Sequence, residues 1–310
     1  MPDPPKRLKY MALLAVAPLL WAGNQVTARG IHEQISPIAL NFWRGVIGIA
    51  FLFIIAGPAM RRHWPVLRAH WRQITLLGFV GAALFQIVLY WGLSYTTAIN
   101  AVVLNSSLPV FMIALSWLLV RETVTARQVA GGLVSFVGVL VIVARADVDV
   151  LRNLAFGFGD ILILVAMVLW ALYSVLIRRL APPVPPLVLL TAMLVAGTGF
   201  MFPLFAFDVI VLGNHTVFSP GVILAVVYVA IFVSVLAVLC WNIGVQKVGA
   251  NIASFIYHML PAYGTVLAIL FLGERFRPYH GLGLALILVG VLVSTHSSSR
   301  SAMPRTGSGG

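Results

Sequence analysis

Residues Leu108-Pro-Val-Phe-Met-Ile-Ala-Leu-Ser-Trp-Leu-Leu-Val-Arg-Glu-Thr123 combine an apolar run, a proline and a terminal Arg-Glu pair. A related stretch lies 152 residues later, where Leu260-Pro261 leads through apolar residues to Gly273-Glu274-Arg275. Each stretch is part of a longer apolar run of about 20 residues, which is enough to cross a bilayer as a helix. Their likeness predicts a duplicated membrane protein.

Other landmarks keep the same order in both halves. The pairs Gly131/Gly283 and Gly138/Gly290 are also 152 residues apart, and the pairs Trp21/Trp170 and Pro37/Pro186 are 149 residues apart. Chance similarity between apolar helices is the alternative to a duplication. If the duplication is real and each half has five helices, the odd number makes the second half enter the membrane from the opposite side. Transporters use such inverted repeats for alternating access.

The composition supports a membrane protein. The chain is 61% hydrophobic and 9% charged, whereas soluble domains have about 25% charged residues. Ten apolar runs can be counted, at about 10–28, 36–57, 73–94, 98–120, 127–144, 157–177, 187–207, 219–241, 250–271 and 279–296. We therefore expect an all-α integral membrane protein with ten transmembrane helices as a 5+5 inverted repeat. The halves are residues 1–150 and 151–296, and residues 297–310 are expected to form a disordered cytoplasmic tail.

The net charge of +12 reflects topology rather than nucleic-acid binding, because the basic residues lie between the apolar runs. With the N-terminus inside, inner segments hold fourteen Lys and Arg residues and outer segments hold five. This bias predicts that both termini are cytoplasmic in a bacterial inner membrane. The first run is expected to be a retained helix rather than a signal peptide. Cys240 stands alone, which excludes an intrachain disulfide.

The two Pro…Glu stretches, together with Ser36-Pro37…Phe42-Trp43-Arg44, resemble the drug/metabolite transporter superfamily, EamA type. The resemblance covers residues 10–296, and it is closest to the aromatic amino-acid exporter (YddG-type) branch. It implies a 5+5 inverted repeat, metabolite export and a central cavity lined mainly by helices 1, 3, 4, 6, 8 and 9. One departure is Met193, which stands where the repeat partner of Arg44 would be.

Polar side chains within the apolar runs are the candidate substrate-binding residues, because polar groups in a bilayer usually face the bundle interior or a wet cavity. The candidates are Trp21, Asn24, Gln25, Gln86, Tyr90, Asn105, Trp170, Tyr173, Tyr257 and His258. The amides could instead hold helices together, and aromatic rings could belong to the interfacial belt, where we expect Trp91 and Trp241. His258 could be a satisfied core histidine, a cavity donor or a proton carrier.

Pro109 and Pro261 each remove a helical hydrogen bond, which permits either a gating hinge or a static kink. Glu122 and Glu274 follow the apolar runs next to arginines and are expected to form ion pairs. No Asp or Glu lies in the middle of a run, which disfavours a cationic substrate. We expect Arg44 to have an ion-pair or carbonyl partner rather than to clamp a substrate carboxylate.

The expected function is export of small neutral or zwitterionic metabolites, with aromatic or hydrophobic amino acids first and other amino acids or drug-like metabolites as the alternative. An enzyme is disfavoured because no nucleophile–base set or metal-ligand cluster is found. A channel is disfavoured because there is no ring of charges. We expect no cofactor, no metal and no nucleic-acid partner, only the bilayer and a small-molecule substrate, with the chain acting as a monomer.

The topology can be tested by cysteine labelling in a Cys240→Ser background. A cysteine at position 274 should react with an impermeant reagent added from outside, and a cysteine at position 122 should not. Labelling of both positions from outside would rule out the inverted repeat.

Overall fold

The structure is a computed structural model that describes residues 4–31, 34–96, 98–145, 147–152, 157–271 and 275–296. This part of the chain consists of helices and connecting turns and has no strand. Eight helical stretches within it are long and apolar enough to cross a membrane. The prediction of an all-helical membrane protein is therefore confirmed, whereas the count of ten is not. The proposed tail at 297–310 lies outside the described residues.

The eight stretches are α2 (Pro37–Ala69), α3–η1–α4 (Trp71–Gly78, Phe79–Leu84, Phe85–Leu93), α5–α6 (Ala98–Asn105, Leu108–Val120), α7 (Ala126–Val143), α9 (Phe158–Leu180), α10 (Pro186–Ile210), α11–η2–α12 (Pro220–Tyr228, Val229–Ala237, Val238–Val248) and α15 (Pro278–Thr295). Three other segments are α1 (Pro4–Ile31), the short α8 (Val148–Arg152) and α13–α14 (Ala250–Tyr257, Met259–Phe271). Helix α1 carries Asn24 and Gln25 near its end, and the α13–α14 segment is interrupted at His258.

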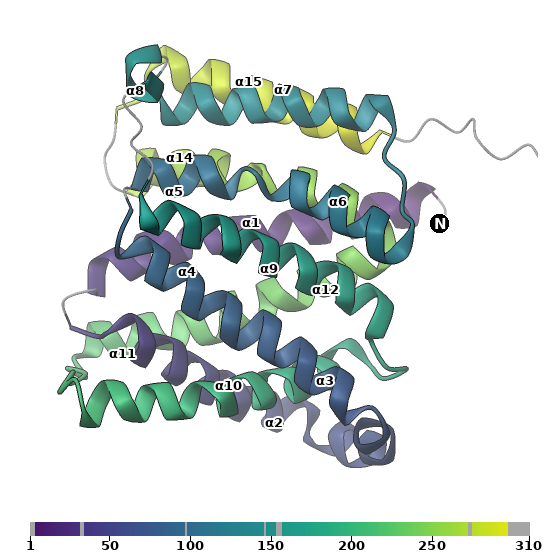
Figure 1. Cartoon of the computed structure of the whole chain (residues 1–310), viewed down its shortest axis with the longest axis vertical. Coiled ribbons are helices and arrows are strands. Elements are labelled where there is room, and N and C mark those ends of the chain that lie inside the picture. The colour runs from purple at the N-terminus through teal and green to yellow at the C-terminus, as the bar shows by residue number, and fades with distance from the viewer. Residues whose placement is uncertain are drawn as a thin grey trace, which may run out of the picture.

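The helices run roughly parallel or antiparallel in a stacked bundle (Figure 1). The pair α7 and α15 lies at one end of the stack, and α2, α3 and α10 lie at the other. Between them, α1 packs against α12, α13 and α14, and α9 packs against α4, α5 and α6. Segments from the two halves of the chain are thus interleaved, and the space between them contains the site described below.

Two helices, α2 and α11, start at serine-proline pairs in the sequence. The Ser36 and Ser219 side chains accept hydrogen bonds from backbone N–H groups three residues ahead, and in each case a proline follows the serine. This is the expected N-cap arrangement. The predicted end of the second helix near residue 57 was wrong, because α2 continues to Ala69 through Pro58 and Pro65. A helix can retain an internal proline at the loss of one hydrogen bond.

The two central prolines do interrupt their helices. The helix before Pro109 ends at Asn105, and the helix before Pro261 ends at Tyr257. Each of these ends is four residues before the proline, where the proline ring would clash with the helical carbonyl and no N–H is available to bond it. Two π-helical segments, η1 and η2, form further irregularities, at Phe79–Leu84 and Val229–Ala237. Such segments are rare and often mark functional sites.

Glycines allow α7 and α15 to pack with their backbones in close approach. A Cβ added to Gly131 would come within 2.6 Å of the Gly290 carbonyl oxygen, and one added to Gly138 would come within 2.8 Å of the Gly283 carbonyl oxygen. Small residues at such contacts are how membrane helices pack without a hydrophobic driving force. These are the glycines that mark the repeat in the sequence.

We predict that Gly138→Ala and Gly290→Ala each lower stability in detergent by about 1–3 kcal/mol, because the added methyl forces the helices apart. Thermal unfolding of the purified protein measures this. Gly199→Ala in α10 is the matched control, because nothing lies within 4 Å of its added Cβ, and alanine favours helix. Equal stability of all three variants would contradict the proposed close contact.

Candidate functional site

The bundle contains a central cavity of about 1260 Å³. It is lined from α1, α2, α4, α5, α9, α10, α13, α14 and both π-helical segments, with small contributions from α7 and α12. Ile35, Ser94, Thr96 and Val143, at or beside the ends of their helices, also line it, so the cavity reaches the face that the sequence predicts to be external. This is a larger volume than the roughly 300–1,000 Å³ of most small-molecule sites, since it includes the passage to that face.

Aromatic rings from α1, α4, α9, α12 and α13 pack together at one side of the cavity, and we call them the aromatic cluster; all of them except Trp241 line the cavity itself. Its members are Trp21, Phe85, Trp170, Tyr173, Trp241 and Tyr257. The Trp21 ring centroid lies 5.3 Å from that of Trp170, 5.4 Å from that of Trp241 and 5.9 Å from that of Tyr257. The interplanar angles are 83°, 54° and 56°. Edge-on and tilted contacts of this kind are favourable.

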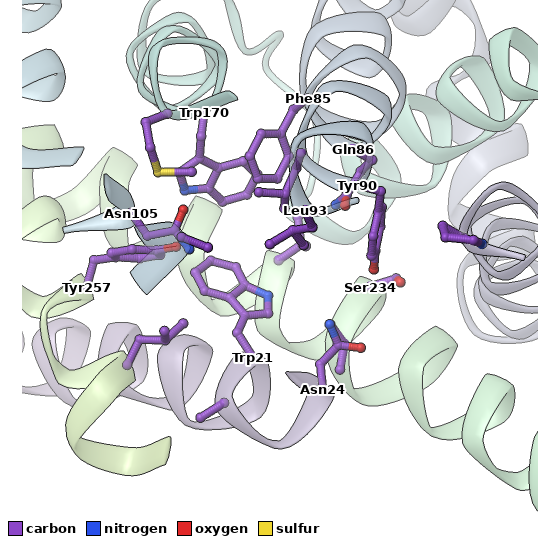
Figure 2. Close-up of a pocket in the computed structure, with 18 of the residues that line it drawn as sticks. Trp21, Asn24, Phe85, Gln86, Tyr90, Leu93, Asn105, Trp170, Ser234 and Tyr257 are labelled. Atoms are coloured by element: carbon purple, nitrogen blue, oxygen red, sulfur yellow. The ribbon is translucent and has the colours of Figure 1, made fainter. Parts of the chain in front are cut away.

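Polar side chains lie on the other side of the cavity, where Figure 2 shows Asn24, Gln86, Tyr90 and Ser234. Ser234 lies in η2 and donates to the carbonyl oxygen of Val229, five residues earlier, at 3.0 Å. Most of the labelled polar side chains are thus on one side of the cavity, and Asn105 is on the side of Tyr257 and Trp170.

Three lining residues carry buried polar atoms without a hydrogen-bond partner in the described part of the protein. They are Asn24 Oδ1, Asn105 Oδ1 and Trp170 Nε1. Buried polar atoms are usually paired, because leaving one unpaired costs about 1–3 kcal/mol. Two free acceptors and one free donor at a cavity wall can pair with a solute or with water.

Arg44 of α2 also lines the cavity and has 8% of its surface exposed. Among the described lining residues it is the one with a formal charge. The described residues supply it with neither a hydrogen bond nor an ion pair; the Tyr90 side chain is its electrostatic neighbour. The expectation of an ion-pair or carbonyl partner for Arg44 is therefore not met within the described residues.

Eight of the ten candidate binding residues line the cavity, namely Trp21, Asn24, Gln86, Tyr90, Asn105, Trp170, Tyr173 and Tyr257. Tyr173 also donates from its hydroxyl to Asn242 Oδ1 at 2.8 Å. Gln25 lies in α1, but its side chain is outside the described part of the structure. Whether any of these residues binds a solute stays a prediction.

His258 does not line the cavity, contrary to its place among the candidates. It is 2% exposed, with Nδ1 2.5 Å from Ser135 Oγ and Nε2 3.1 Å from the Ser106 carbonyl oxygen. Both ring nitrogens are thus satisfied at the junction of α13 and α14. It is a core histidine that holds the interrupted helix against its neighbours.

Trp241 was expected in the interfacial belt, and this was wrong. Its side chain is fully buried within the aromatic cluster, and its Nε1 donates to Ser174 Oγ at 3.0 Å. Phe85 and Ser234 were missed as lining residues. A hydroxyl in the apolar run around Ser234 was a usable signal, whereas Phe85 is one of many phenylalanines in the chain and gave none.

Pro261 lines the cavity, and Pro109 is buried at the start of α6. The opposite end of the bundle, on the predicted cytoplasmic face, is held by different contacts. Glu122 is ion-paired to Arg178 of α9, and Arg179 donates to the Leu119 carbonyl oxygen at 3.1 Å. Glu274 lies outside the described residues. No cluster of metal-ligating side chains is found in the described part of the chain.

The sequence and the fold can both be compared with those of known proteins. The model of the EamA-like transporter family matches residues 8–144 and again residues 157–295. The uncharacterized transporter YetK of Bacillus subtilis is 30% identical over 295 residues, which cover 93% of this chain and 87% of that protein. The uncharacterized transporter YyaM of the same species is 28% identical over 262 residues, 84% and 85% of the two chains.

Two further similarities bear on the fold and the relatives. A probable terminal-alkyne amino-acid exporter of Streptantibioticus cattleyicolor is 25% identical over 288 residues, 93% of this chain and 94% of that protein. A solved crystal structure that is 23% identical superposes with a TM-score of 0.76 and covers 93% of this chain and 96% of that one, which supports the fold. The family match spans most of the sequence, and the chain therefore belongs to the EamA-like transporter family, whose members are multi-pass membrane transporters rather than enzymes.

Proposed function

We propose that this transporter exports small neutral or zwitterionic metabolites, with aromatic and hydrophobic amino acids as its first substrates. The observation that carries the proposal is the divided cavity: the aromatic cluster faces a group of uncharged hydrogen-bonding side chains. An aromatic amino acid needs an apolar surface for its ring and polar partners for its two charged groups. Other amino acids and drug-like metabolites are the alternative substrates.

The relatives support the proposal at a coarse level. YetK and YyaM are named transporters without a substrate. The relative from Streptantibioticus cattleyicolor is named a probable amino-acid exporter. At 25% identity this favours amino acids over unrelated solutes, while the choice of aromatic side chains depends on the cavity wall of this chain.

The proposed architecture is ten transmembrane helices in a 5+5 inverted repeat. In favour of it, one family model matches the chain twice, in the two halves. Arg7 donates to the Thr295 carbonyl oxygen at 3.0 Å, which supports placing the first and the last helix ends of the chain on the same face of the bundle. With the Lys/Arg bias, this face is the cytoplasmic side of a bacterial inner membrane. The transporter is proposed to act as a monomer.

Transport is proposed to proceed by alternating access, in which the cavity opens to one face at a time. The cavity reaches the proposed external face, while the Glu122–Arg178 pair and the Arg179–Leu119 hydrogen bond lie at the other. The interruptions before Pro109 and Pro261 are the proposed hinges, because α6 and α14 can move without breaking an intact helical ladder.

Substrate binding is tested by Trp21→Ala and Tyr257→Ala in proteoliposomes loaded with phenylalanine or tryptophan. Loss of one ring should weaken substrate affinity about 2- to 13-fold, which corresponds to roughly 0.5–1.5 kcal/mol for an aromatic contact. Tyr257→Phe should cost less than Tyr257→Ala, because the ring remains. Counterflow with a panel of amino acids measures both affinity and selectivity.

Asn105→Ala and Trp170→Ala complete the set, and protein level in the membrane is matched for every variant. The control is Trp64→Ala, which removes a 60% exposed tryptophan that does not line the cavity. If none of the panel is transported by the wild type, the amino-acid assignment fails. If all four cavity variants match Trp64→Ala, the cavity is not the substrate site.

The hinge proposal is tested by Pro109→Ala and Pro261→Ala. Restoring the missing N–H should stiffen the junctions, so that exchange slows while substrate affinity in equilibrium binding stays near the wild-type value. Pro203→Ala is the control, because Pro203 lies within the uninterrupted helix α10. Exchange rates equal to that of Pro203→Ala would make the two prolines static kinks.

A further inference from the structure

The cavity contains one charged side chain for which the described part of the chain supplies no counter-charge. Arg44 lines the cavity and is 8% exposed. Ion pairs in the described part of the chain join Arg178 to Glu122 and Arg152 to Asp149, and none of these four residues lines the cavity. Arg44 has no hydrogen-bond acceptor among the described residues. The side chain that interacts with it electrostatically is Tyr90, which is uncharged at neutral pH.

A buried cation without a counter-charge is energetically unfavourable, since it loses hydration and gains nothing in return. Charged side chains in membrane helices face the bundle interior or a wet cavity and mark the path of a substrate. An anionic group of the transported solute would supply the missing charge. A guanidinium binds a carboxylate with two parallel N–H···O bonds, which makes this pairing both strong and directional.

The rest of the lining limits the solute to one negative charge at this site. The other described lining residues carry no formal charge, and Met193, the repeat counterpart of Arg44, also lines the cavity. The duplication therefore places a cation on one side only. A phosphate dianion would keep an unmatched charge, whereas a carboxylate would not.

The polar and aromatic parts of the cavity together suit a solute that has a carboxylate at one end and an apolar or aromatic group at the other. Figure 2 shows Tyr90, the electrostatic neighbour of Arg44, on the opposite side from Trp21, Trp170 and Tyr257. A carboxylate at Arg44 leaves an apolar or aromatic side chain to contact those rings. Asn24, whose Oδ1 has no hydrogen-bond partner in the described residues, lines the same cavity.

We propose that Arg44 binds the carboxylate of the transported solute, so that a free carboxylate is required for recognition. The proposal rests on the proposed export function and deepens it. It names Arg44 as the residue that separates carboxylates from otherwise similar neutral molecules. It does not depend on whether the solute also carries an amino group.

The binding test uses the purified full-length protein and three probes: 3-phenylpropionate, 3-phenylpropionamide and phenyl phosphate. The first two have nearly the same shape, but 3-phenylpropionate has a charged carboxylate where 3-phenylpropionamide has a neutral amide. A hydrogen-bonded charge should favour the carboxylate by about 10- to 150-fold in Kd. Tryptophan fluorescence titration measures the ratio, because two tryptophans line the cavity. Tightest binding of phenyl phosphate, or equal binding of acid and amide, would overturn the proposal.

Variants assign the preference to Arg44. Arg44→Met introduces the residue found at the equivalent place in the second half, and it should bring the acid-to-amide ratio close to one. Arg44→Lys keeps the charge and loses the planar fork, so the ratio should fall only in part. If Arg44→Met does not fold, the ratio for Arg44→Lys decides, and a wild-type ratio in that variant counts against the bidentate carboxylate site.

Two controls separate this role from general charge effects. Arg152→Met makes the same substitution at an exposed arginine and should keep the wild-type ratio. Glu33→Gln removes a carboxylate of the segment that the structure does not describe, and it should also keep the ratio. Loss of the preference in either control would show that Arg44 is not its source.

A transport arm distinguishes this proposal from the proposed function. Counterflow of phenylalanine and of 3-phenylpropionate is measured for the wild type and for Arg44→Met. If 3-phenylpropionate binds through Arg44 but no amino acid is transported, the amino-acid assignment fails and the carboxylate site stands. If phenylalanine is transported equally well by both proteins, the carboxylate site fails and the amino-acid assignment stands.

Discussion

The cost of an unpaired polar group in a low-dielectric interior is the constraint on which this structure depends. Every backbone N–H and C=O within the bilayer must be bonded inside the protein, which leaves helices as the form of the spanning segments. Side chains obey the same rule. Asp160 and Asp208 are buried, yet they accept hydrogen bonds from Asn100 and Asn214 and from neighbouring serine or threonine hydroxyls. Polar atoms that escape this pairing are therefore informative, and several of them lie on the cavity.

Those exceptions relate the fold to the site. Within the described residues, Asn24, Asn105 and Trp170 have unpaired atoms, and Arg44 has an unpaired charge, on four different helices that meet at one space. The helix irregularities occur around the same space: the breaks at Ser106-Ser107 and His258, and the two π-helical segments. Irregular backbone in a membrane protein is tolerated where protein or a water-filled cavity surrounds it. In the proposed carrier, the same features that weaken the helices allow them to move.

The sequence was sufficient to predict the helical membrane class and eight of the residues that line the cavity, for definable reasons. Trp21 and Trp170, and Asn105 and Tyr257, occupy corresponding places in the two halves, and polar or aromatic residues at corresponding interior places converge on a shared centre. The misses were of another kind. His258 was placed among the binding candidates with a core role left open, and Trp241 was expected in the belt; burial and partners from distant helices decided both. Pro58 looked like a helix end, because a proline pattern cannot show that the helix resumes its hydrogen bonds beyond it.

Arg44 shows why a residue pattern and a structure answer different questions. Its position within an apolar run made it notable, and the ordinary expectation was a partner supplied by the protein. Whether that partner exists depends on every side chain near Arg44 in the neighbouring helices α4, α10 and η2. A single sequence does not show which side chains lie near one another. A carrier also has to release its solute after the cavity has opened to the other face. One guanidinium with neutral surroundings recognises a carboxylate without the several ionic bonds that would make release slow. A single charge among the described lining residues is therefore consistent with recognition and release at the same site.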